Sequence, residues 1–213
     1  MGDLLQMVVE LAVAGLCGVT AASISVADSE TDGYRTLTAT DRLAREIDEV
    51  QYRSGGPCVE AIAGSSAVME PLPSTRWPEL SLAAARAGAA AVWSLPLAGS
   101  TEVGASLNLY ASTGQPWAEE RAALAAALAA GAATILDQRQ ALSRCEQLNA
   151  TLQRALETRT VIGQAQGVLM ARQRITASEA FEVLRRASQR TNRKLRDIAF
   201  EIVSKMTGEH HAG

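Results

Sequence analysis

Apolar positions follow helical spacing near both ends of the chain. Residues 4–15 form one apolar stripe, and residues 195–206 form a second with the spacing i, i+3, i+4, i+7 and i+11. Such stripes predict amphipathic helices that bury one face. The second stripe consists of Leu195, Ile198, Ala199, Ile202 and Met206.

Between these helices the apolar positions alternate with polar ones. Residues 22–26 alternate in the manner of a half-buried strand, and residues 34–40 follow as its partner after a polar turn at 28–33. Residues 91–96 and 103–110 predict a second β-hairpin, with its turn at 98–102.

Further helices are predicted between the two hairpins. Asp41 is placed to cap a helix that runs to about Gln51, after which Gly55-Gly56-Pro57 breaks the chain. Trp77-Pro78 opens an Ala-rich helix that ends near Gly88. This order of elements predicts an α+β unit with one antiparallel sheet and helices on its faces.

A long helix is predicted at the join to the C-terminal region, because no proline occurs from Trp117 to Arg172. Its first part, to about Leu136, is expected to pack on the N-terminal unit. Beyond that point, heptad rows predict a parallel two-stranded coiled coil in which a lone Asn in an a position sets the register. The expected seam residues are Leu142, Asn149, Leu152 and Leu156.

The C-terminal region predicts a three-helix unit that includes the end of the long helix. Thr176 and Glu179 have the spacing of a capping box at the start of the second helix. Gly163 and Gly167 on the first helix are expected to allow close approach of another helix. The residues assigned to the core of this unit include Ala180, Leu184, Ala187 and Thr191, with Phe181 and Phe200.

The charged residues are distributed unevenly along the chain. Residues 1–152 carry 9 Arg and 17 Asp plus Glu, a net charge of −8, whereas residues 153–208 carry 11 Lys plus Arg and 5 acidic residues, a net charge of +6. A basic helical unit joined to an acidic body is the pattern expected when only one part meets a polyanion. A solvated helix face rich in Arg explains the same counts, so charge alone leaves both interpretations open.

Composition argues against several classes of enzyme and of metal or cofactor site. The two histidines, His210 and His211, lie in the C-terminal tail, which argues against a Ser-His-Asp or Cys-His enzyme and against a His ligand for haem. The three cysteines lack CxxC spacing, which argues against a zinc site. We therefore expect no catalytic residues, no metal and no cofactor. No signal peptide and no apolar run of about 18–20 residues is evident, so we expect no membrane contact and a cytoplasmic location.

The N-terminal half resembles a GAF sensory domain of the actinobacterial type, over about residues 3–137. The resemblance implies an antiparallel sheet of about six strands, with a pocket on one face and the terminal helices on the other. It also implies a small-molecule or protein partner as the source of a signal. The matching strings are QYRSGGPCVEAIAGSSAV (51–68), RWPEL (76–80), VWSLPLAG (92–99) and GASLNLYAS (104–112).

The occupant of the implied pocket is open at this point. GAF domains hold cyclic nucleotides, haem, bilins, small metabolites or nothing. Cys58, beside a predicted helix start, is either a small buried residue or a redox-active thiol whose pKa the helix N-terminus lowers. Trp77 and Trp93 either line the pocket or belong to the core.

The C-terminal region resembles the ANTAR domain, an RNA-binding antitermination module. Family members commonly carry Lys where this chain has Gln166, a change that removes one charge and keeps hydrogen-bonding ability. The resemblance implies that a dimer binds paired hairpins in nascent leader RNA and prevents formation of a terminator. The matching strings are ETRTVIGQAQGVLMAR (157–172), EAFEVLRRASQRTNRKLRDIA (179–199) and the ending Ile202-Val203.

RNA contacts are expected from polar residues outside the three-helix core, because loop bases are recognised by edge hydrogen bonds and by stacking. No aromatic residue is expected on this face, so Arg side chains are expected to supply the stacking. The expected RNA-binding residues are Gln166, Arg172, Arg186, Gln189, Asn192, Arg193 and Lys194.

Three segments are therefore expected: a GAF domain over 1–137, a coiled-coil linker over 138–156 and an ANTAR domain over 157–208. The N-terminal half lacks the alternating β-α run of a phospho-acceptor domain, so a ligand or partner of the GAF domain is expected to act through the helical linker. Two other interpretations stay open. One is a thiol sensor or enzyme that uses Cys58, and the other is a helix-turn-helix-like regulator that binds duplex DNA.

Overall fold

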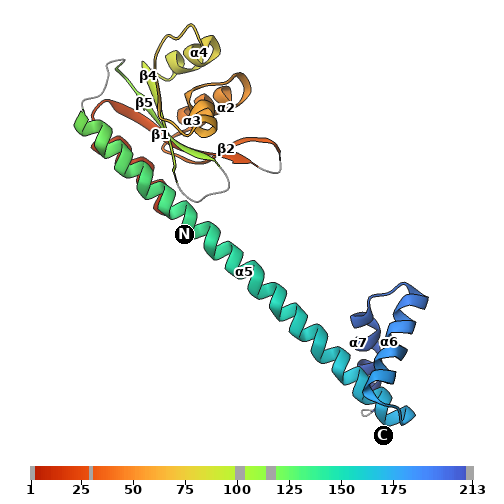
Figure 1. Ribbon diagram of the computed structural model, residues 1–213. Helices are drawn as coiled ribbons and strands as arrows, with labels where there is room; N and C mark the ends of the chain where they lie inside the picture. Colours follow the sequence, from red (N-terminus) through yellow and green to blue (C-terminus); the bar gives the residue numbers. More distant parts are fainter. Residues whose placement is uncertain (1–2, 29–30, 99–103, 114–118, 210–213) are drawn as a thin grey trace. The chain divides into compact units, whose positions relative to one another are not determined.

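The computed structural model describes residues 3–28, 31–98, 104–113 and 119–209, and the chain forms two compact units, Met1–Leu142 and Ser143–Gly213 (Figure 1). One helix, α5 (Glu119–Gln173), supplies residues to both units. Several predicted features lie wholly or partly outside the described residues: the turns at 28–33 and 98–102, the position of Val103, the start of the long helix at Trp117, and His210 and His211.

The N-terminal unit contains a five-stranded antiparallel sheet in the order β2-β1-β5-β4-β3. Both predicted β-hairpins are confirmed, since β1 pairs with β2 and β4 pairs with β5. The pairing of β1 with β5 joins the two hairpins and sets Ser23 opposite Asn108. The strands are β1 (Val19–Asp28), β2 (Gly33–Ala39), β3 (Val68–Pro71), β4 (Ala91–Pro96) and β5 (Ala105–Ala111).

The edge strand β3 is an element that the sequence pattern does not predict. It has four residues, and its side chains are half-buried or exposed, so it carries little of the apolar alternation by which strands are found. It is assigned by its pairing with β4. The resemblance implies about six strands, whereas the described residues form five.

Helices cover both faces of the sheet, with α1 and the first part of α5 on one face and α2, α3 and α4 on the other (Figure 1). The predicted cap is confirmed, because the Asp41 carboxylate accepts a hydrogen bond from the Ala44 N–H at 2.8 Å. The predicted break after α2 is also present, but Pro57 starts a new helix at once. These helices are α1 (Asp3–Gly15), α2 (Arg42–Ser54), α3 (Pro57–Gly64) and α4 (Pro78–Arg86).

The apolar core of the N-terminal unit lies between the sheet and the helices α1 and α5. Ile24 of β1 and Leu107 of β5 are fully buried there, on the face that alternates with the polar positions of the same strands. The small side chains of α5 let this helix lie close to the sheet. The α5 residues buried in this core are Ala125, Ala129, Ala132, Ala133 and Leu136, as expected for packing to about Leu136.

The C-terminal unit packs α6 (Ala177–Thr191) and α7 (Leu195–Glu209) against the end of α5. The predicted capping box is confirmed: the Glu179 N–H donates to Thr176 Oγ1 at 3.3 Å, and the Thr176 N–H donates to Glu179 Oε2 at 2.8 Å. The core is small. Its buried residues are Ala165, Leu169, Ala180, Leu184, Ile198 and Ala199.

Three residues assigned to this core from the sequence are exposed instead. Thr191 lies at the exposed end of α6, Phe181 is 40% exposed and Phe200 is 65% exposed. The core between three short helices is filled largely by Ala, Leu and Ile side chains, which leaves both phenyl rings at its margins. The assignment of the two aromatic residues to the core was therefore wrong.

Gly163 and Gly167 of α5 do not serve close packing within the C-terminal unit. A Cβ atom added at Gly163 or at Gly167 would meet no atom within 4 Å. The expected close approach of another helix therefore does not occur at these positions among the described residues, and both glycines face open space.

Candidate functional site

The sheet face beneath α2 and α3 is polar, although it is buried. Ser23 and Ser25 of β1 and Ser106 and Asn108 of β5 are fully buried there. Ser94 of β4 is also buried, and its Oγ has no hydrogen-bond partner among the described residues. This is the face on which the GAF resemblance implies a pocket, and side chains of the protein itself occupy it.

Asp48, from α2, is the centre of this polar network. Its Oδ1 accepts hydrogen bonds from Ser23 Oγ at 2.9 Å and from Asn108 Nδ2 at 3.3 Å. The Tyr110 hydroxyl also donates to Oδ1, and Thr36 Oγ1 donates to Oδ2 at 2.8 Å. The carboxylate is thus held by donors from three strands.

Burial controls the acidity of this carboxyl. Loss of solvent raises the pKa of Asp48 from 3.8 to about 6, against the opposing effect of hydrogen bonds from Tyr110, Thr36, Ser23 and Asn108. The folded protein therefore binds this proton more tightly than the unfolded chain does. It follows that the free energy of unfolding falls as the pH rises from about 4 to about 6.

We expect Asp48→Asn to stabilise the protein at pH 7.5 by up to about 3 kcal/mol, the equivalent of a pKa difference of about 2 units. The amide keeps an acceptor for Ser23 and Tyr110 but carries no charge to desolvate. Urea unfolding at pH 4 and pH 7.5 measures the effect, which should shrink at the lower pH. Glu49→Gln, an exposed neighbour on α2, is the matched control. A less stable Asp48→Asn protein at pH 7.5 would show that the network needs the negative charge.

Cys58 does not have the surroundings of a reactive thiol. It is fully buried, its Sγ lies 3.4 Å from Ser106 Oγ, and its N–H donates to Gln51 Oε1 at 2.9 Å. Burial, together with the Asp48 carboxylate, raises the pKa of the Cys58 thiol to about 11, so its position near a helix N-terminus does not activate it. This geometry favours the interpretation of Cys58 as a packed residue.

The two tryptophans considered as pocket residues belong to packed regions. Trp77 is buried among residues of α2, α4 and the sheet, with the Arg76 guanidinium carbon 4.3 Å from the centre of its ring. Trp93 is partly buried against the core on the opposite face. The polar network was not predicted, although the alternation Ser106, Asn108 and Tyr110 in β5 carried a signal for it.

The residues predicted to bind RNA lie at separate places on the C-terminal unit. Gln166 lies near the start of α6, where its Nε2 donates to the Ala177 carbonyl at 3.0 Å. Arg172 lies in the last turn of α5. Asn192, in the left-handed conformation, ends α6, and its N–H donates to the Ser188 carbonyl. The 15 residues of α6 separate these two ends by about 22 Å.

The remaining predicted residues are exposed on α6 or in the turn that follows it. Arg186 and Gln189 are exposed on α6, and Lys194 is exposed in the turn. Arg193 forms an ion pair with Glu201 at 2.9 Å, which reduces its availability to phosphate. The structure thus brings Gln189, Asn192, Arg193 and Lys194 to one end of α6 and places Gln166 and Arg172 toward the other.

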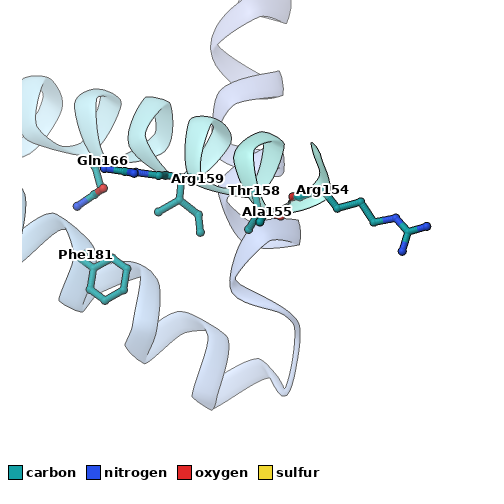
Figure 2. Close-up of a pocket in the computed structure, with 7 residues that line it drawn as sticks. Arg154, Ala155, Thr158, Arg159, Gln166 and Phe181 are labelled. Carbon is teal, nitrogen blue, oxygen red and sulfur yellow. Dashed lines mark hydrogen bonds between the residues drawn. The ribbon is translucent and has the colours of Figure 1, made fainter. Parts of the chain in front are cut away.

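An open groove between α5 and α6 was missed in the sequence. Its lining residues include Phe181 of α6 and two arginines of α5, Arg154 and Arg159, none of which is among the seven expected RNA-binding residues (Figure 2). A second, smaller groove between α5 and α7 contains Phe200 and Arg196. Exposure of both aromatic residues is the feature that helical periodicity did not reveal.

The predicted seam residues are exposed on α5. Asn149, Leu152 and Leu156 belong to the C-terminal unit, and Leu142 is the last residue of the N-terminal unit. Leu152 is 55% exposed and Leu156 is 64% exposed, and Leu142 and Asn149 are exposed as well. Exposed leucines repeated at this spacing are costly on an isolated helix, so these residues are suited to contact with another apolar surface.

Two features are absent from the part of the chain that the structure describes. No helix in this part of the chain combines the length and apolar character needed to cross a membrane. Within the same ranges, no group of three or more His, Cys, Asp or Glu side chains is arranged to hold a metal ion.

Comparison with known proteins assigns both units. The sequence model of the GAF domain matches residues 1–137, and that of the ANTAR domain matches residues 150–203. No curated protein matches the chain.

Solved structures resemble the N-terminal unit in fold. A domain of a two-component sensor histidine kinase protein from Sinorhizobium meliloti 1021 is 16% identical, with a TM-score of 0.54 over 69% of this chain and 97% of that one. The GAF domain of a two-component sensor histidine kinase from Bacillus halodurans is 9% identical, with a TM-score of 0.53 over 67% of this chain and 97% of its own.

A third similar structure is the GAF domain from an Acinetobacter phosphoenolpyruvate-protein phosphotransferase. It is 15% identical, with a TM-score of 0.51 over 66% of this chain and 84% of its own. Identities this low support the fold alone. Because the GAF domain matches more than half of the chain and the ANTAR domain follows it, the chain belongs to the GAF domain family and is a regulatory protein that joins a GAF sensory domain to a C-terminal ANTAR domain for RNA binding in transcription antitermination.

Proposed function

We propose that the protein acts as a dimer that binds two neighbouring hairpins in a nascent leader RNA and so prevents a terminator from forming. The observation that carries this proposal is the ANTAR match over residues 150–203, in a region whose net charge is +6 over 153–208. Basic side chains attract the RNA backbone, and loop bases supply the sequence information. Each protomer holds one hairpin.

Dimerisation is the step that makes two weak contacts into one strong contact. The seam through Leu142, Asn149, Leu152 and Leu156 joins the two copies as a parallel coiled coil. Once the first hairpin is bound, the second C-terminal unit meets its hairpin at a high effective concentration. The exposure of these leucines supports the proposal.

The signal enters at the GAF domain and reaches the ANTAR domain through α5. Residues of this helix belong to the core of the N-terminal unit at Ala125–Leu136 and to the core of the C-terminal unit at Ala165 and Leu169. A ligand or protein that repacks the first core therefore acts on the same helix that carries the seam. The functional segments are a GAF domain over 1–137, a linker over 138–156 and an ANTAR domain over 157–208.

The test uses RNA recovered by crosslinking in the native cell, from which a two-hairpin segment is synthesised. We expect full-length protein to bind this RNA about 100-fold or more tightly than either hairpin alone, because linkage supplies the second contact. Binding should weaken steeply with salt as counterions are released. Gel-shift titrations at several salt concentrations measure both effects.

Duplex DNA of the same length serves as the competitor in this experiment. It should bind only at low salt and without preference for sequence. Equal affinity for one hairpin and for two would contradict the dimeric mechanism, and tighter binding to duplex DNA would favour the helix-turn-helix interpretation.

A further inference from the structure

The groove between α5 and α6 combines an aromatic face with unopposed positive charge. Its volume is about 520 Å³, and Figure 2 shows the Phe181 ring of α6 facing the α5 side chains, with Gln166 at one end and Arg154 extending outward at the other. Thr158 and Ile162 line it as well. The complete lining is Arg154, Ala155, Thr158, Arg159, Ile162, Gln166 and Phe181, a set without a carboxylate.

The two arginines of the groove differ from cations of the C-terminal unit that form ion pairs, among them Arg185, Arg193, Arg196 and Lys205. Arg185 is paired with Glu182 at 2.8 Å, and Lys205 is paired with Glu201 at 2.7 Å. No ion pair joins Arg154 or Arg159 to a carboxylate of the described residues. Their guanidinium groups are therefore available to an anion from outside the chain, and two donor forks beside one groove suit phosphate oxygens.

The exposed ring of Phe181 adds an apolar stacking surface beside the two arginines. A phenyl ring that is 40% exposed beside a groove offers an apolar face against which a flat, unstacked base can pack. The Gln166 side-chain amide already donates one N–H to the Ala177 carbonyl, which fixes its orientation and leaves its carbonyl oxygen and its second N–H for a base edge.

A second copy of this chain is the other conceivable occupant of the groove, and the heptad pattern argues against it. The seam rows that contain Leu152 and Leu156 continue to Arg159, Gly163 and Gln166 at seven-residue spacing. Two parallel helices would therefore bring like charges together at Arg159, so the apolar seam ends at Leu156. The groove begins in the last turn of the seam, at Arg154, and extends beyond it to Gln166. Its charge is complementary to a polyanion.

We propose that this groove binds a single unstacked nucleobase of an RNA hairpin loop together with its flanking phosphates. The base stacks on Phe181, Gln166 accepts from its edge, and Arg154 and Arg159 hold the phosphates. This inference rests on the proposed RNA binding and adds a site that is distinct from the turn at the end of α6.

The experiment uses full-length protein and hairpin RNA that carries 2-aminopurine at successive loop positions. Wild-type protein should quench or shift the fluorescence at one position, because stacking on an aromatic ring changes the emission of this base analogue. Phe181→Ala should abolish that change and weaken binding about 10-fold. Phe181→Trp, which restores an aromatic face, should recover both.

Phe200→Ala is the matched control, because it removes from the other groove a phenyl ring that is even more exposed, 65% against 40% for Phe181. It should leave the fluorescence change and the affinity as they are in the wild type. Thermal melting followed by circular dichroism establishes that each variant is folded, and Phe181→Leu keeps apolar volume without a ring if the alanine variant melts early.

Three results would overturn the inference. In the first, Phe181→Ala and Phe181→Leu, both folded, bind and report like the wild type. In the second, Phe181→Ala loses dimerisation, measured by sedimentation, in proportion to its loss of RNA affinity, which would make a second copy the occupant. In the third, Phe200→Ala has the larger effect. Failure of wild-type protein to bind any hairpin RNA would instead remove the proposed function itself.

Discussion

Replacement of Leu152 and Leu156 by aspartate is expected to convert the protein to a monomer and to weaken binding of two-hairpin RNA about 100-fold or more. Both leucines are more than half exposed on α5. In a parallel coiled coil they would become buried knobs, and the double variant would place four carboxylates in one seam, where burial of like charges is prohibitive. Affinity for a single hairpin should stay close to the wild-type value, because the RNA-binding face is retained.

Sedimentation velocity and gel-shift titration at matched concentration measure these two effects. Leu82→Asp, which changes a similarly exposed leucine of α4, is the control and should leave the dimer intact. Cys145 offers an independent probe, since it occupies the seam row that contains Leu152 and is exposed. In a Cys17→Ser background, mild oxidation should link wild-type protomers through Cys145, as side chains at such positions lie within disulfide reach.

The result that would contradict the seam is a double variant that remains dimeric and keeps its preference for two hairpins. Absence of the Cys145 crosslink in an otherwise dimeric protein would show instead that the copies meet in another register or through another surface. Either outcome would leave the single-hairpin interaction to be explained separately.

Leu184→Ala is expected to unfold the C-terminal unit and to abolish RNA binding while the N-terminal unit stays folded. Leu184 is fully buried in a core of only six buried residues. Truncation of a buried leucine costs about 2–5 kcal/mol, and a three-helix unit of this size has little stability beyond that. The cavity has few neighbours that could relax into it.

Thermal unfolding followed by helical signal at 222 nm should show an early transition in Leu184→Ala that the wild type lacks. Tryptophan fluorescence reports the other unit, because Trp77 and Trp93 belong to the N-terminal unit. The fluorescence transition should not move. Val183→Ala, at a neighbouring position that is 38% exposed, should change neither signal by much. A Leu184→Ala protein that binds RNA normally would show that the unit tolerates the cavity.

Local signals in the sequence predicted most of the elements. Asp41 and Thr176 begin helices because their side chains satisfy backbone N–H groups within three residues, so no distant part of the chain is needed. The two β-hairpins were equally local. The edge strand β3 was missed because its four residues depend on pairing with β4 for their conformation.

The candidate site was predicted less completely for a different reason. Gln166 lies in the groove as well as in the predicted RNA-binding set, but its neighbours Phe181, Arg154 and Arg159 lie outside that set. Periodicity states which side of a helix is apolar. It does not state how much of that side the neighbouring helices cover, and the small core here leaves Phe181 partly uncovered.

The sequence by itself determined the two-part organisation, the helix caps, the heptad rows of α5 and the contrast between an acidic and a basic region, because each depends on residue type and spacing along one chain. Only the tertiary structure decided that Asp48 meets Ser23, Asn108 and Tyr110 inside a polar network. It also decided that Phe181 lies beside Arg154 and Arg159, which form no ion pair among the described residues. A strand in which serine and leucine alternate can turn its serines either to water or to a buried carboxylate, and the sequence pattern is the same in both cases. The difference arises from which helix packs over the strand, a long-range arrangement that no local pattern encodes.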